Sequence, residues 1–410
     1  MLRRTFALCC VLLAAPAVSA QTFSQRGFLE GRATVFPQDA PNDPVNALGE
    51  LLAREELFAR PAPWIQFAAG VDLRVNTHDQ VGTAARIDFT DRTTLRPLLS
   101  IRRLSASVHH RWLTVDVGKQ FIRWGKADIV TPTDRFAPRD FLNVIDNEFL
   151  GVTGVRGVVQ AGGETVEVVV VPRFTPSRTP LLNQRWTPNP PGAANLRFVD
   201  GGARFPERTQ AGVRWSHIGT AFEYALSYYD GFNHLPNIEA HVPFVPGELI
   251  LTRAYPEITA YGVDAAAPTP WFTLKGEAAY VTSPEAGSDE YVVYVLQLER
   301  LSGEWVFVGG YAGEVVTERN APSTFAPDRG LTGSFVGRAS FTIDVNRSAA
   351  IEGAVRQNGD GGYAKAEFSQ AHGQHWRMTV GGSVLAGQDG DFLGQYRRNS
   401  HISAALRYSF

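Results

Sequence analysis

The feature that most constrains this chain is an alternation of apolar and polar side chains that recurs along almost its whole length. In the segment 64–75, Phe67 and Leu73 fall on one face, while Gln66 and Asp72 fall on the other. A period of two residues is typical of a β-strand that lies between an apolar and a wet environment. Very short turns and long loops alternate between these segments. The pattern therefore predicts an all-β chain whose antiparallel strands are joined as hairpins.

The segment 48–59 leaves the number of strands open. Its composition favours a helix, which could act as a plug, whereas its position between two strands favours a strand. With this segment the chain has 18 predicted strands, and 16 is the fallback, because a closed barrel with both termini on one side needs an even number. The 18 segments are 27–36, 48–59, 64–75, 95–108, 113–121, 152–161, 165–173, 210–216, 221–230, 258–266, 272–282, 291–301, 305–316, 335–344, 349–357, 363–370, 376–385 and 401–410.

The first 20 residues have the features of a secretory signal peptide. Arg3 and Arg4 precede an apolar run over 6–18, and small residues end the segment at Ala20. We therefore expect residues 1–20 to be removed and residues 21–410 to form one barrel domain. Both cysteines of the chain lie in the leader, so no disulfide or thiol chemistry is expected in the exported protein.

An exported chain of this kind can enter a membrane in one way. After the leader, no window approaches the roughly 18 uninterrupted apolar residues that a membrane helix needs. Lipid offers no partner for unpaired backbone groups, so strands can cross it only as a closed barrel. Without Arg3 and Arg4 the formal charge is about −4, which gives no indication of nucleic-acid binding. The sequence predicts a transmembrane antiparallel β-barrel with short periplasmic turns and long extracellular loops.

The last ten residues, 401–410, alternate strictly and end in Phe410. A closing strand with a terminal aromatic residue resembles the assembly signal of bacterial outer-membrane β-barrels. The resemblance implies location in the bacterial outer membrane. It also implies contact with outer-membrane lipid and lipopolysaccharide, and recognition of the closing strand by the barrel-assembly machinery.

Tryptophan residues collect beside the predicted short turns. An indole ring is stable at a membrane–water boundary, where the ring is dehydrated and its N–H stays wet. We therefore predict a periplasmic aromatic girdle made of Trp64, Trp112, Trp215, Trp271, Trp305 and Trp376. The alternation also reverses near Arg102 and Arg103, where we expect a β-bulge.

Charged and polar residues occupy the strand positions opposite the apolar face. Facing lipid, an Arg or Lys at the membrane midplane would cost up to roughly 2–4 kcal/mol, so these positions are expected to face the lumen. They imply a polar interior that is either water-filled or plugged. The predicted lumen-lining residues are Asp72, Arg74, Asp116, Gln120, Arg156, Arg214, Glu223, Asp264, Lys275, Glu277, Arg338, Glu352, Arg356, Lys365, Glu367, Arg377 and Arg407.

The loop 122–149 is long enough to need a functional reason. Its mixed charges would let it fold into the lumen and narrow it, and opposed charges at such a constriction can orient a polar solute. The predicted constriction residues are Arg123, Lys126, Asp128, Asp134, Arg139 and Asp140. The alternative for Asp134 and Asp140 is that each only caps a turn, beside Pro132 and Pro138.

The start of this loop resembles a family of porin-like proteins related to the alginate-exporter group. In that family a strand ends in a G-x-Q-x-x-x-W-G pattern and leads into a loop that contains Pro and Asp. The matching residues here are Gly118, Gln120, Trp124, Gly125, Pro132 and Asp134, with a weaker match over Glu277–Tyr280. The lumen has no dense arginine belt of the kind that export of alginate itself would need.

These features predict a channel rather than an enzyme. The histidines lie in turns and loops without a partner spacing typical of a hydrolase, and we expect no cofactor or metal. The function expected is passive or facilitated diffusion of small polar solutes such as saccharides or organic acids. The alternatives are a polysaccharide (alginate-type) export pore and a plugged structural or adhesive barrel.

Overall fold

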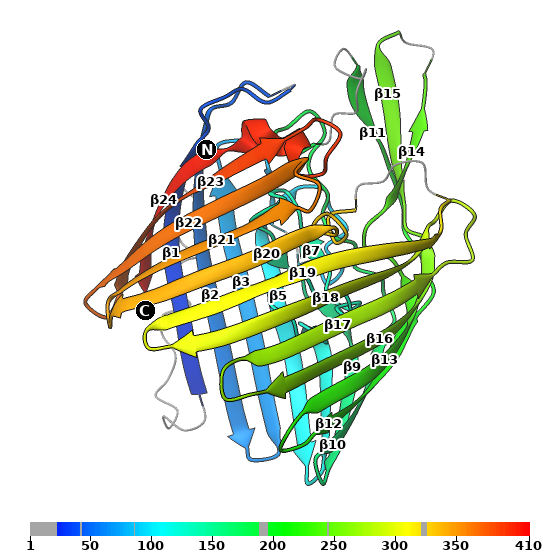
Figure 1. Ribbon diagram of the computed structural model, residues 1–410, viewed down its shortest axis with the longest axis vertical. Helices are drawn as coiled ribbons and strands as arrows, with labels where there is room; N and C mark the ends of the chain where they lie inside the picture. Colours follow the sequence, from blue (N-terminus) through cyan, green and yellow to red (C-terminus); the bar gives the residue numbers. More distant parts are fainter. Residues whose placement is uncertain (1–22, 42, 86, 188–195, 244–245, 321–325) are drawn as a thin grey trace.

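The computed structural model describes residues 23–41, 43–85, 87–187, 196–243, 246–320 and 326–410; the predicted signal peptide lies outside the described residues. Its main element is a ring of 18 antiparallel strands in which each strand pairs with the next and the first pairs with the last (Figure 1). These strands are β1 (Phe23–Val35), β2 (Ala47–Ala62), β3 (Ile65–Asn76), β5 (Arg96–His110), β6 (Leu113–Gln120), β9 (Val152–Ala161), β10 (Glu164–Val171), β12 (Gln210–Ile218), β13 (Glu223–Phe232), β16 (Glu257–Pro268), β17 (Thr273–Thr282), β18 (Glu290–Ser302), β19 (Trp305–Glu318), β20 (Ser334–Asp344), β21 (Arg347–Arg356), β22 (Gly361–His372), β23 (Trp376–Gly387) and β24 (His401–Ser409). Since β1 pairs with β24, the ring has no free edge.

Each predicted strand corresponds to one strand of the ring. The ambiguous segment 48–59 lies inside β2, so it is a strand and neither a helix nor a plug. The predicted bulge is also present. Gly70 of β3 pairs with Arg103 and the next residue pairs with Ile101, which leaves Arg102 as the extra residue of β5.

The outer surface of the barrel is apolar. In β3 the side chains of Phe67 and Leu73 are exposed, whereas those of Asp72 and Arg74 are buried on the inner face. Large exposed apolar side chains recur in the same way on the other strands of the ring. A belt of this extent is typical of a barrel that faces lipid. Among the described residues, no helix is long and apolar enough to cross a membrane.

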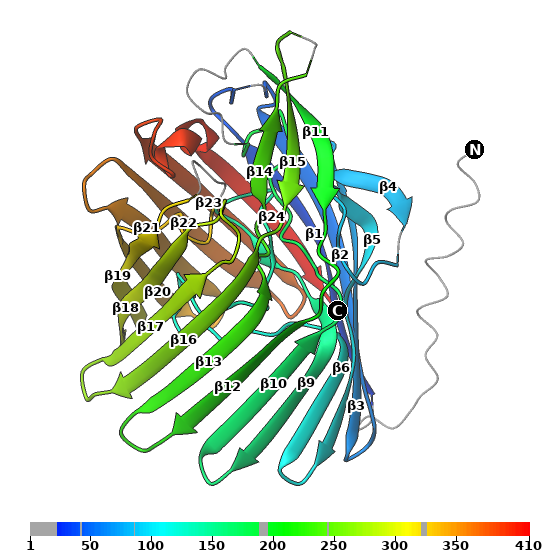
Figure 2. The same ribbon diagram turned by 90° about the vertical axis from the view of Figure 1, so that its right-hand side faces the viewer.

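Several further elements arise from the long loops and were not predicted. β4 (Val81–Ala85) runs parallel to β5, and β7 (Arg139–Asp140) pairs with β8 (Glu148–Phe149). A three-stranded sheet of β11 (Arg197–Arg204), β15 (Glu248–Ala254) and β14 (Asn237–His241) projects above the barrel (Figure 2). A 3-10 helix, η2 (Gly394–Asn399), precedes β24.

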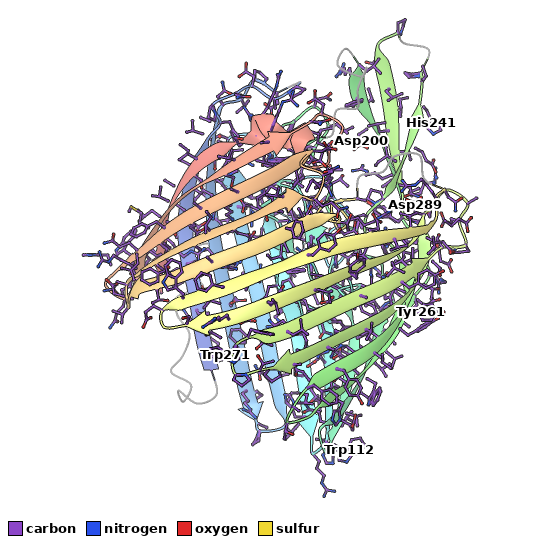
Figure 3. The ribbon with its side chains drawn as sticks, in the orientation of Figure 1. Trp112, Asp200, His241, Tyr261, Trp271 and Asp289 are labelled. Carbon is purple, nitrogen blue, oxygen red and sulfur yellow. The ribbon has the colours of Figure 1, made fainter. Side chains whose placement is uncertain are left out.

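The two ends of the barrel differ. Trp112 and Trp271 lie at the end with the short turns, and Asp200 and His241 lie on the projecting sheet at the opposite end (Figure 3). All six tryptophans predicted for the girdle are exposed, and Trp271, at 70%, is the most exposed of them. Their role at a membrane boundary stays a prediction.

The interior contains an apolar part that the sequence analysis did not describe. Long loops fold inward and form an apolar core with inward-facing residues of the wall. Trp124 and Phe136 from the loop after β6 pack there with Val169, Tyr229 and Val293 from the strands. Part of the lumen is therefore filled by protein, and this filling positions the candidate site.

Candidate functional site

The segment 121–151, called the constriction loop below, leaves the wall at the end of β6 and returns at β9. As predicted, it folds into the barrel. Its backbone contacts β17 and β18, which are separated from β6 by several strands in the order of the ring. The loop therefore crosses the lumen from one wall to another.

Glu277 on β17 fixes the far side of the constriction loop. Its Oε2 accepts hydrogen bonds from the backbone N–H groups of Lys126 and Ala127, at 2.8 and 2.9 Å. Its Oε1 accepts from the N–H and the hydroxyl of Thr133, both at 2.8 Å. Hydrogen bonds to a charged group contribute about 1.5–3 kcal/mol each, so this carboxylate is a strong anchor. The sequence placed Glu277 in the lumen but did not reveal this role.

Charged side chains of the loop add contacts to the same wall. The backbone N–H of Asp128 donates to Gln297 on β18 at 3.1 Å, and its carboxylate accepts from Lys275 Nζ at 3.0 Å. Lys126 Nζ lies 2.8 Å from Glu223 on β13. The charges predicted for a constriction thus meet opposite charges on the wall.

Two arginines of the loop share one aromatic ring. The guanidinium carbons of Arg123 and Arg139 each lie 4.2 Å from the ring centroid of Phe149, at cation–π distance. Asp134 has a different role, because its Oδ1 accepts from the backbone N–H groups of Trp124 and the following residue, both at 2.7 Å. Asp134 therefore shapes the turn, and its other carboxylate oxygen lies 3.3 Å from Arg123 Nε.

A cavity of about 290 Å³ lies against the constriction loop. The loop provides one side of it, and further long loops and the strands β13, β16, β18, β21 and β22 provide the rest. Its charged lining residues are Asp128, Asp134, Arg135, Arg139, Asp328 and Glu352. Charges of both signs around a cavity of this size could orient a small polar molecule.

Asp140 lies in a buried ion-pair network. Its carboxylate accepts from Arg96 Nε at 2.9 Å and from Arg178 at 2.6 Å. Arg96 also reaches Glu50 on β2, at 3.3 Å. Burial alone would raise the pKa of Asp140, but the guanidinium groups of Arg96 and Arg178 outweigh it and hold that pKa well below its usual range. The network joins the constriction loop to the barrel wall.

A second loop, 172–187, crosses toward the two ends of the chain. Arg185 donates to the carbonyl oxygens of Val45 at 2.7 Å and Gln38 at 2.9 Å, and its guanidinium lies 4.0 Å from the ring centroid of Phe36. Asn399 in turn donates to the carbonyl oxygen of Arg185 at 2.7 Å. This loop, together with the constriction loop, fills part of the lumen.

Most of the predicted lumen-lining residues pair with neighbours. The pairs and distances are Asp72–Arg54 (2.7 Å), Arg74–Glu50 (3.3 Å), Asp116–Arg156 (3.4 Å), Arg214–Asp264 (2.9 Å), Lys275–Glu299 (2.7 Å), Arg356–Asp391 (2.6 Å) and Arg407–Glu30 (2.6 Å). Lys365 pairs with Asp146 of the constriction loop. Hydrogen bonds join Gln120 to Gly154, Glu352 to Tyr363 and Arg377 to Ser369. Arg338 and Glu367 lie on β20 and β22. The wall is thus largely neutralised by its own pairs.

Sequence reasoning missed several residues that hold the site together. Gln297, Arg96, Arg178 and Arg185 gave no local pattern, because their partners lie far away along the chain. The only indication was the unusual length of the loops after β6 and β10.

His234 links the second loop to the constriction loop. Its Nδ1 lies 2.6 Å from the carbonyl oxygen of Thr175, and its Nε2 lies 2.9 Å from that of Arg135. The ring stacks on Phe174 with a centroid separation of 5.3 Å. A neutral imidazole carries one N–H, so it can donate to only one of the two carbonyls. Burial lowers the pKa of His234 to about 4, in spite of both carbonyls.

This pKa predicts that acid weakens the inner loops. Between pH about 6.5 and 4 the unfolded chain takes up a proton at His234 and the folded chain does not. The free energy of unfolding is therefore not reduced by this group above pH about 6.5. It decreases by up to ~1.4 kcal/mol per pH unit as the pH falls toward 4. Replacing His234 with Gln should flatten this dependence, measured as the melting temperature of the purified barrel between pH 4 and 7.5. His241→Gln, at an exposed histidine of β14, is the control, and an equal flattening there would contradict the assignment.

Comparisons with known proteins agree with the fold. No protein-family model matches the chain, and a search of curated proteins gives no match either. Among solved structures, OccAB4 of Acinetobacter baumannii aligns with a TM-score of 0.56 at 10% identity, covering 96% of this chain and all of the other. A BenF-like porin of Pseudomonas fluorescens Pf-5 aligns with a TM-score of 0.54 at 10% identity, covering 95% of this chain and 98% of the other. OccK3 (OpdO) of Pseudomonas aeruginosa aligns with a TM-score of 0.52 at 12% identity, covering 94% of this chain and 96% of the other. At such low identity the likeness establishes a porin-like barrel fold.

Proposed function

We propose that this protein is a bacterial outer-membrane channel for passive or facilitated diffusion of small polar solutes, such as saccharides or organic acids. The observation that carries the proposal is the constriction loop, which Glu277 ties across the lumen beside a charged cavity of about 290 Å³. An apolar outer belt and a closed ring support location in the outer membrane. A solved structure with this fold is named a porin, and channels of this kind carry out no chemistry, which supports a channel rather than an enzyme.

Two alternatives make different predictions. The motif at Gly118–Gly125 supports a relation to the alginate-exporter group, and hence an export pore, but the solved structures with this fold named above include a porin and no such exporter. The two inward loops and their apolar core favour a plugged structural or adhesive barrel. For each of these functions we propose that the barrel-assembly machinery recognises β24, the strand that closes the ring by pairing with β1.

Liposome swelling with sugars of graded size distinguishes these functions. A channel narrowed by the constriction loop should admit small sugars and exclude larger ones with a steep cutoff. An export pore should admit oligosaccharides as well. The absence of uptake for every sugar would contradict the channel and support the plugged barrel.

Loss of two cations from the constriction loop should change ion selectivity. Lys126→Ala plus Arg139→Ala leaves the carboxylates of Glu223 and Asp134 less compensated, so we expect a shift toward cations in single-channel reversal potentials. Arg60→Ala plus Arg111→Ala, at the short-turn end, removes the same charge outside the constriction. Unchanged selectivity in the first double variant would remove these residues from the solute path.

A further inference from the structure

A second cavity, of about 550 Å³, lies outside the constriction and is called the rim pocket below. It is formed by the start of β5 and the residues before it, the segment 176–179, and the base of the projecting sheet. Aromatic, hydroxyl and basic side chains share its lining: Thr83, Arg92, Thr93, Thr94, Thr179, Phe205, Arg253 and Tyr255. Stacked rings form one wall, since Phe205 and Tyr255 lie 5.6 Å apart at an interplanar angle of 16°.

Arg92 is the lining arginine of this pocket whose charge has no ion-pair partner among the described residues, whereas Arg96 and Arg178, which also line it, are paired with Asp140. Its Nε donates to the carbonyl oxygen of Phe174 at 3.1 Å, and its guanidinium lies 4.9 Å from the ring centroid of Phe205. No ion pair joins Arg92 to any of the described residues. Arg253, by contrast, is paired with Asp200 at 2.8 Å. Burial and the nearby Arg173 lower the pKa of Arg92, against the weaker effects of Asp88 and Glu207. A guanidinium in this position has donors left for an anion.

The rim pocket lies at the boundary of the apolar belt. Lys119 is opposite Leu104 in the sheet, and therefore on the outer face, and yet its side chain is fully buried. The segment 88–91 covers it from outside, with Asp91 Oδ2 at 2.5 Å from Nζ. The neighbouring Thr153 donates to the carbonyl oxygen of Phe89 at 2.8 Å. Here the apolar outer surface of β5 and β6 gives way to a polar layer, and Arg92 follows directly in the chain.

Residues 87 and 89 have exposed apolar side chains. Ile87 is 75% exposed and Phe89 is 38% exposed. Exposed apolar residues beside buried charges are typical of a segment that lies in the interface between acyl chains and headgroups. The rim pocket therefore opens at the level of the headgroups if the barrel spans the outer membrane.

We propose that the rim pocket binds an anionic saccharide, with Arg92 contacting its phosphate or carboxylate and the rings of Phe205 and Tyr255 contacting the sugar. Such a group is present in the headgroup of outer-leaflet lipopolysaccharide and also in free sugar phosphates. The exposed Ile87 and Phe89 favour the lipid. The inference rests on the proposed outer-membrane location but not on conduction, so a barrel that conducts nothing would leave it intact.

The test compares three probes with the full-length barrel in detergent: rough lipopolysaccharide, the same lipopolysaccharide after dephosphorylation, and glucose 6-phosphate. Affinity is measured by calorimetry. Arg92→Gln should weaken binding of the intact lipopolysaccharide about tenfold or more, because one charge-assisted contact is lost. Arg92→Lys keeps the charge and should lose less. Arg60→Gln at the opposite rim is the matched control and should bind as the parent does. A circular-dichroism spectrum of each variant verifies folding.

The probes also separate the sources of the anion. Arg92-dependent binding of lipopolysaccharide that dephosphorylation abolishes supports the lipid headgroup. Arg92-dependent binding of glucose 6-phosphate alone supports a site for a free anionic sugar. The proposal would be overturned if the parent, Arg92→Gln and Arg60→Gln bound all probes equally. It would also be overturned if the parent bound none of them.

Discussion

Replacing Glu277 with Ala should raise the single-channel conductance and make the open current noisy. The substitution removes four hydrogen bonds to Lys126, Ala127 and Thr133. At about 1.5–3 kcal/mol for each bond to a charged group, the loss exceeds what the remaining side-chain contacts of Asp128 and Lys126 can offset. The far side of the constriction loop would then leave β17 and widen the lumen. Planar-bilayer recording, together with the size cutoff in liposome swelling, measures both effects.

Glu367→Ala is the matched control for this experiment. Glu367 lies on β22, another strand of the ring. Its replacement removes one negative charge and leaves the hydrogen bonds between Glu277 and the constriction loop in place. Its conductance should remain near that of the parent. If Glu277→Ala and Glu367→Ala gave the same current, the effect would be one of charge, and the anchoring role of Glu277 would have to be withdrawn.

Replacing Asp140 with Asn should give the largest loss of stability among the substitutions considered. It leaves Arg96 and Arg178 buried beside a neutral amide. Breaking a buried ion pair in this way costs ~3–5 kcal/mol. Here two guanidinium groups lose their shortest carboxylate contact, and only the longer contacts remain, from Arg96 to Glu50 at 3.3 Å and from Arg178 to Asp91 at 3.8 Å. We expect the constriction loop and the second loop to exchange amide hydrogens much faster, while the strands of the ring stay protected. Hydrogen–deuterium exchange with mass spectrometry measures both regions in one experiment.

The pKa of Asp140 gives this prediction a pH dependence. Because the folded-state pKa lies well below the usual range, the stabilisation is complete above the unfolded-state pKa of about 3.9 and is lost only as the pH falls further. At pH 5 the loop amides of the parent should exchange more slowly than those of Asp140→Asn. Asp39→Asn, at an exposed aspartate, is the control. Equal exchange in the parent and in Asp140→Asn at pH 5 would show that the network does not hold the loops.

The barrel could be predicted from the sequence because its rules are local. Alternation assigns each residue of a strand to one of two faces, and short turns fix which strands pair. The bulge at Arg102 was visible as a reversal of the alternation, and β2 was resolved by its neighbours in spite of a helical composition. In lipid each of these strands must also be paired on both sides, because the backbone groups of an unpaired strand edge find no other hydrogen-bond partner there.

The arrangement inside the barrel could not be predicted in the same way. Lys126 and Glu277, or Arg185 and Val45, are far apart in sequence, and no periodicity relates them. From the length and charges of the loop 122–149, the sequence correctly predicted that it folds into the barrel, but it did not identify Glu277 as the carboxylate that binds the loop. For the projecting sheet a related reason applies to β11, which pairs with β15 as a parallel strand from a different loop, whereas β14 and β15 form an antiparallel pair within one loop that the sequence analysis did not predict. Parallel pairing leaves no hairpin turn to detect.

The pairing of β1 with β24 has a consequence for how the protein is made. Of the 18 strands of the ring, β1 comes earliest and β24 latest along the chain, so a ring that still lacks β24 has two open edges. Such edges invite pairing with other chains, and a contact between the chain ends is the slowest kind to form. The strands must therefore be kept from pairing with other chains until β24 is in place, and a truncation that removes β24 would leave a sheet that can polymerise rather than a smaller pore.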